Sequence, residues 1–127
     1  MKATMSVFKT AREDFKGKLE ELGLRVYTYE EDNPKPPCAI VIPADPYYRP
    51  LGGEKTMAAY WTIGLNIVLI GQKGTKPAHT DFLDDALERV ILAVEPYGSI
   101  SPISRPGSIE LSDGEYFGVV IEFEYNP

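Results

Sequence analysis

The hydrophobic positions of this chain follow two periods, and the changes from one to the other divide it into elements. Between Ser6 and Leu22 the apolar residues recur every three or four positions, which is typical of one face of a helix. They are Val7, Phe8, Ala11, Phe15, Leu19 and Leu22. Ser6 is the expected N-cap, and Gly23 is the residue expected just after the last turn.

A second helical pattern begins near Thr80. We expect its apolar stripe to be buried; it consists of Phe82, Leu83, Ala86, Leu87, Val90, Ile91 and Val94. Asp81, Asp84 and Asp85 stand in the expected first turns, where the helix dipole favours negative charge. Pro96 and Gly98 are expected to end this helix.

Strands are predicted where apolar and polar residues alternate or where a short run is wholly apolar. The expected strands cover residues 24–29, 38–42, 58–71, 108–112 and 115–125. The run from Cys38 to Ile42 is uniformly apolar and precedes Pro43, so we expect a central strand that ends there, with Cys38 buried. Asp113 and Gly114 predict a hairpin turn between the last two strands. The last strand should have one apolar face and one polar face.

This order of elements predicts an α+β fold, with a mainly antiparallel sheet of about five strands packed against two helices. The sequence contains no internal repeat, low-complexity tract or composition change that marks a boundary. We therefore expect a single domain over residues 1–127.

The stretch between the second and third strands, approximately residues 44–58, has no sustained period. It carries the residue types that are enriched at protein interfaces: Tyr47, Tyr48, Arg49, Leu51 and Met57. Pro46, Pro50, Gly52 and Gly53 suit an extended arm better than a packed element. We predict a projecting arm that contacts another subunit; the alternative is that its aromatic side chains fold back over the domain's own core.

Charge changes the picture in the second half of the chain. The net charge is −6. Residues 1–76 carry 11 basic and 9 acidic side chains, whereas residues 77–127 carry 2 basic and 10 acidic ones. An acidic surface disfavours tight, sequence-independent binding to nucleic acid, and it either attracts a basic partner or simply remains solvated. The apolar runs are too short to span a membrane, and the N-terminus has no apolar leader, so we expect a cytoplasmic product.

The inventory of reactive side chains is small: one His, one Cys and no glycine-flanked serine. His79 with Asp81, Asp84 and Asp85 is the one cluster that resembles a metal or acid–base site. These aspartates also suit a helix N-terminus. We expect no catalytic residue, no metal and no cofactor; a small ligand-binding or metal-dependent enzyme domain using His79 and Asp81 is the alternative from another class.

The order of these features resembles the tail terminator proteins of long-tailed (siphovirus-type) bacteriophages. The resemblance begins with the amphipathic N-terminal helix and continues through LRVYTYEEDNPKPPCAIVIPADPYY, YWTIGLNIVLI, TDFLDDALERVILAV and GEYFGVVIEFEY, so that it extends over nearly the whole chain. The strand pair VYTY…PPCAIVIP and the GEYFG entry to the last strand carry most of it. It includes no catalytic motif.

The resemblance implies a structural protein of the virion, assembled in the host cytoplasm, that forms a ring, typically of six subunits, and needs no cofactor. The ring would cap the head-proximal end of the tail tube and join it to the head–tail connector. Genomic DNA would slide through it unbound, past an acidic wall for which Glu122 and Glu124 are the candidates. The arm would reach a neighbouring subunit. Another neck, head–tail completion or minor tail protein is the alternative within this class.

Overall fold

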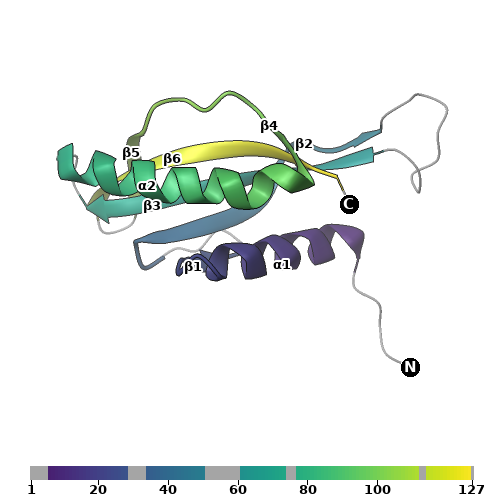
Figure 1. Cartoon of the computed structure of the whole chain (residues 1–127), viewed down its shortest axis with the longest axis horizontal. Helices are drawn as coiled ribbons and strands as arrows, with labels where there is room; N and C mark the ends of the chain where they lie inside the picture. The colour runs from purple at the N-terminus through teal and green to yellow at the C-terminus, as the bar shows by residue number, and fades with distance from the viewer. Residues whose placement is uncertain (1–5, 29–33, 51–60, 74–76, 112–113, 127) are drawn as a thin grey trace.

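The computed structural model describes residues 6–28, 34–50, 61–73, 77–111 and 114–126 (Figure 1). In these ranges the chain forms two α-helices, a short 3₁₀ helix and six strands. In chain order the elements are α1 (Val7–Glu20), β1 (Arg25–Tyr27), β2 (Cys38–Pro50), β3 (Trp61–Lys73), α2 (Pro77–Val94), η1 (Glu95–Tyr97), β4 (Gly98–Ile100), β5 (Gly107–Leu111) and β6 (Gly114–Tyr125).

Helix α1 is capped as the sequence predicts. The Ser6 side chain accepts a hydrogen bond of 3.0 Å from the backbone N–H of Lys9, which satisfies one of the free donors at the helix start. Beyond the last turn, Gly23 has a φ of +86°, a conformation that a side chain would strain. Both ends of α1 are therefore set by local residue choice.

Helix α2 begins at Pro77, earlier than the predicted start near Thr80. Proline suits the first helical turn because its missing N–H would be unpaired there in any case. The earlier start corrects one expectation: the first turn contains no acidic residue, and Asp81, Asp84 and Asp85 lie further along the helix. The dipole, which acts on the first turn, does not account for these aspartates.

The sheet is mixed and its strands lie in the order β1-β2-β3-β6-β4, with β5 also paired to β6. β1 runs parallel to β2, and the other pairings are antiparallel. The α+β class with two helices is confirmed. Over the described ranges the sheet has six strands where about five were predicted, because β4, a three-residue strand, follows directly after η1 where the sequence predicted a loop.

Both helices cover the same face of the sheet, as Figure 1 shows. The buried residues from the helices pack against strand residues that alternate along each strand and so share one side. The cluster comprises Ala11, Phe15 and Leu19 of α1, Leu83, Val90 and Val94 of α2, Val26, Ala39 and Val41, Ile63, Leu65, Ile67 and Leu69, and Val119, Ile121 and Phe123. This layer is the main hydrophobic core.

Strand β2 does not end at Pro43, so that prediction is wrong. Pro43 pairs with Leu65, and the pairing resumes with Tyr48 opposite Ile63. Between these two pairs β2 advances by five residues, whereas β3 advances by two. This irregularity accommodates Pro43 and Pro46 within one strand. Of the predicted arm, residues 44–50 belong to β2, and residues 51–58 lie outside the described ranges.

Candidate functional site

The opposite face of the sheet carries no helix within the described residues, and we call it the free face. Its side chains are the ones that alternate with the core residues of β2, β3 and β6. One row across the three strands is Ile40, Val68 and Val120, and the next is Ile42, Asn66 and Glu122. The free face therefore changes from apolar to polar along the strands.

This gradient limits the prediction of a polar second face on the last strand to one part of that strand. Cys38, Ile40, Ile70 and Tyr116 form a second, smaller buried cluster towards one end of the free face. Val120, next along β6, remains 44% exposed. The predicted burial of Cys38 is confirmed, at 1% exposure. Only the half of β6 that contains Glu122 and Glu124 is polar on this face.

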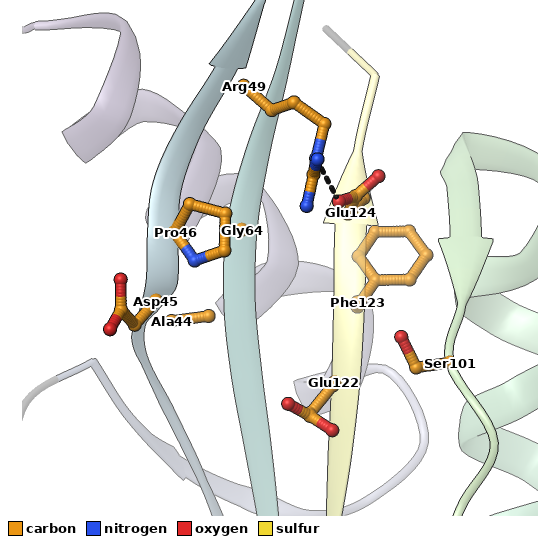
Figure 2. A pocket seen from close by; sticks show the side chains of 9 residues that line it. All are labelled: Ala44, Asp45, Pro46, Arg49, Gly64, Ser101, Glu122, Phe123 and Glu124. Atoms are coloured by element: carbon orange, nitrogen blue, oxygen red, sulfur yellow. Dashed lines mark hydrogen bonds and ion pairs between the residues drawn. The ribbon is translucent and has the colours of Figure 1, made fainter.

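A shallow pocket of about 180 Å³ lies at the polar end of the free face (Figure 2). It is lined by the irregular part of β2, by β3, by β6 and by the residue that follows β4. These residues are Ala44, Asp45, Pro46, Arg49, Gly64, Ser101, Glu122, Phe123 and Glu124. The Asp45 carboxylate points away from the centre of the pocket, whereas Arg49 extends across it towards Glu124.

Arg49 and Glu124 form an ion pair across this pocket. Arg49 Nε donates to Glu124 Oε1 at 2.8 Å. Because β3 lies between β2 and β6, the pair bridges two strands that are not neighbours. The side chains are 50% and 36% exposed, so water screens the attraction and the pair contributes less than about 1 kcal/mol. Its main effect is to place a residue of the predicted arm beside a residue of the predicted acidic surface.

Gly64 of β3 allows the backbone of β2 to approach very closely on the free face. A Cβ on Gly64 would lie 2.1 Å from the Pro46 carbonyl oxygen, well inside any permitted contact. The glycine in a strand otherwise rich in β-branched residues was the sequence signal for this close approach. Sequence reasoning missed that role, and it also missed Asp45 and Ser101 as residues of this pocket.

The predicted interface residues separate in the structure. Tyr47 turns to the helix side, where its ring lies 4.7 Å from the ring of Phe8 and its hydroxyl accepts a hydrogen bond from Arg12. Tyr47 thus packs within its own domain, against the main core. Tyr48 and Arg49 are exposed on β2, while Leu51 and Met57 lie outside the described residues.

Two polar atoms on the free face are buried without a hydrogen-bond partner among the described residues. They are Thr62 Oγ1 and Asn66 Oδ1. Asn66 lies in the middle of the free face, between Ile42 and Glu122. Unsatisfied buried polar atoms are uncommon in folded proteins.

Two groups have shifted acidities. Burial raises the pKa of the Cys38 thiol from 9.0 to about 11, against a smaller opposing effect of Arg25. Burial also raises the pKa of Tyr125, with added contributions from Asp14 and Tyr97. The raised pKa keeps the Cys38 thiol protonated near neutral pH, and a thiol is a far weaker nucleophile than a thiolate.

The lining of the pocket includes one guanidinium, from Arg49, and three carboxylates, from Asp45, Glu122 and Glu124. Among the described residues, no group of three or more His, Cys, Asp or Glu is placed to hold a metal ion. His79 lies in the first turn of α2, its side chain is outside the described part, and Asp81 is exposed.

The helices in the described ranges include none that is long and apolar enough to cross a bilayer. Comparison of the chain with models of known protein families and with curated protein sequences finds no match.

Proposed function

We propose that this chain is a structural virion protein, the tail terminator of a long-tailed phage. In this role a ring, typically of six copies, caps the head-proximal end of the tail tube and joins it to the head–tail connector. The protein needs neither a catalytic centre nor a cofactor for that task. The sequence resemblance motivates the proposal, and the α+β fold with two helices is compatible with it.

The observation that carries the proposal furthest is the character of the free face. A sheet face without helices is normally covered by something else when it is apolar. Here Val120, an apolar side chain paired with Val68, is 44% exposed. A subunit of a larger assembly would bury such a surface against a neighbouring protein.

The polar end of the free face supports a place near the DNA channel. Glu122 is exposed, and like charge keeps a phosphate backbone from adhering to a wall that carries it. Glu124 is the weaker candidate because Arg49 already neutralises part of its charge. We therefore assign the lumen role first to Glu122.

The proposal is tested by the mass and shape of the purified protein. Light scattering after size exclusion should give a closed oligomer, and negative-stain electron microscopy should show rings with a central hole. Labelled protein should also bind one end of purified tail tubes. A monomer at high micromolar concentration would sink the proposal, and if that monomer bound a divalent metal the enzyme alternative would gain. Rings that bind a connector but not the tube would identify another neck protein.

A further inference from the structure

The two outer edges of the helix layer differ in charge. On α1, Lys18 lies 4.4 Å from the centre of the Tyr97 ring and so faces the end of α2. Arg12 contacts Tyr47 of β2, on the other side of the helix. Lys9 and Lys16 stand three and four residues from Arg12 and therefore lie on that same outer side, which Glu13 and Glu20 border one turn from these lysines. We call Lys9, Arg12 and Lys16 the basic edge.

The outer side of α2 has the opposite character. Arg89 donates to the Leu22 carbonyl oxygen at 3.0 Å, which identifies the side of α2 that faces α1. A hollow of about 280 Å³ lies on α2 away from that contact. We call it the acidic hollow; it is lined by Asp84, Leu87, Glu88, Ile91 and Leu92.

The acidic hollow combines an apolar floor with a carboxylate rim. Leu92 is 66% exposed, a high value for a leucine on a helix. A lysine or arginine side chain fits such a site, because its hydrocarbon stem covers apolar surface while its charged end reaches a carboxylate. The partner chemistry is therefore a row of basic side chains on a regular element.

This chain supplies that row at its other edge. Arg12 and Lys16 are separated by one helical turn, as are Asp84 and Glu88 across the hollow. Two acidic hollows placed face to face would bring like charges together, so a twofold dimer through this surface is disfavoured. A head-to-tail contact pairs opposite charges, and repeated head-to-tail contacts close into a ring when the rotation permits.

We infer that the acidic hollow on α2 of one subunit receives the basic edge of α1 from a second copy of this chain. The helix layers of neighbouring subunits then continue one another around the ring, with α1 of one subunit beside α2 of the next at each junction. This inference rests on the proposed ring and specifies which two surfaces build it.

The test is a charge swap in the full-length chain. With Lys9→Glu/Lys16→Glu, the α1 edge becomes acidic like the hollow on α2. With Asp84→Lys/Glu88→Lys, the hollow becomes basic like the α1 edge. Each double variant should raise the dissociation constant of the oligomer at least about tenfold, measured by sedimentation velocity over a dilution series. The chain with all four substitutions, and an equimolar mixture of the two double variants, should both recover assembly.

The matched control is Glu110→Lys/Glu115→Lys in the β5–β6 hairpin, which makes the same change in net charge. Both glutamates are exposed, and neither belongs to α1 or lines the hollow. This control should assemble as the unmodified chain does, and urea unfolding of every variant checks that the monomer is folded.

The outcomes separate the two proposals. Double variants that assemble normally, or a fourfold variant that stays dissociated although folded, would overturn this interface while leaving the ring intact. An unmodified chain that is monomeric at all accessible concentrations would overturn the ring and the interface together. The contact is established if both double variants lose assembly and if the fourfold variant and the mixture recover it.

Discussion

The two faces of strand β3 obey different constraints although they share one backbone. On the helix side, Ile63, Leu65 and Ile67 are wholly buried in the main core. On the free face the same strand carries Gly64 and Asn66, neither of which a core would favour at its centre. The helix side thus resembles the interior of any small domain, whereas the free face has a mixed and individual composition.

The difference teaches where function can reside. A substitution on the helix side changes the packing of the main core, so the residues there are constrained by the stability of the fold. Fewer elements pack against the free face, so the residues there can be constrained by binding to a partner instead. Four experiments test this contrast, from the largest expected effect to the smallest.

The largest effect is expected from Ile67→Ala on the helix side. Ile67 is fully buried, and removing its side chain should lower the free energy of unfolding by about 2–5 kcal/mol through lost burial and a residual cavity. Val120→Ala on the free face should cost less than about 1 kcal/mol because that side chain is already 44% exposed. Urea titration of both variants at a concentration where the chain is monomeric measures this; equal losses would refute the contrast.

The second effect concerns Gly64, where the free face is tightly packed by backbone. Gly64→Ala should destabilise the fold by about 1–3 kcal/mol, because the new Cβ would overlap the Pro46 carbonyl and force β2 outward. Gly17→Ala in α1 is the control, since nothing lies within 4 Å of its Cβ position and alanine favours a helix. It should stabilise by up to about 1 kcal/mol. Thermal unfolding of both variants would show the opposite signs, and a neutral Gly64→Ala would contradict the geometry.

The third effect is confined to alkaline pH. Folding raises the pKa of Cys38 from 9.0 to about 11, so the unfolded chain releases this proton first. The stability contributed by the neutral thiol is complete below about pH 9 and is lost as the pH rises towards 11. The unfolding free energy of the native chain should therefore fall relative to Cys38→Ala across this window. Parallel titration curves for the two proteins would contradict the assigned burial.

The smallest effect is expected at the Arg49–Glu124 pair. Arg49→Met, Glu124→Gln and the double variant should yield a coupling energy below about 1 kcal/mol, reduced further at 0.5 M salt as the exposed charges are screened. Chemical denaturation of the four proteins in a double-mutant cycle measures it. A coupling above about 2 kcal/mol would mean that the free face is as tightly constrained as the core.

The sequence determined the elements whose signals are local. Helix α1 follows from its apolar spacing and from Ser6 at its start, and the β5–β6 hairpin follows from the turn residues before Gly114. Periodicity alone also placed the helix-side residues of β3 and β6, because one buried face imposes a period of two. Local rules failed at Pro43 and at the start of α2, where pairing with β3 and the tolerance of a first turn for proline outweighed them.

Only the tertiary structure decided which residues meet. Arg49 and Glu124 are 75 positions apart, and no periodic pattern indicates that β2 and β6 flank β3 closely enough for an ion pair. The same holds for Tyr47, whose residue type suits an interface but whose ring packs on Phe8 of α1. Periodicity indicates which side of an element is buried. Strand order and long-range packing determine which other elements that side contacts. The free face, the basic edge and the acidic hollow emerge only when that second information is added.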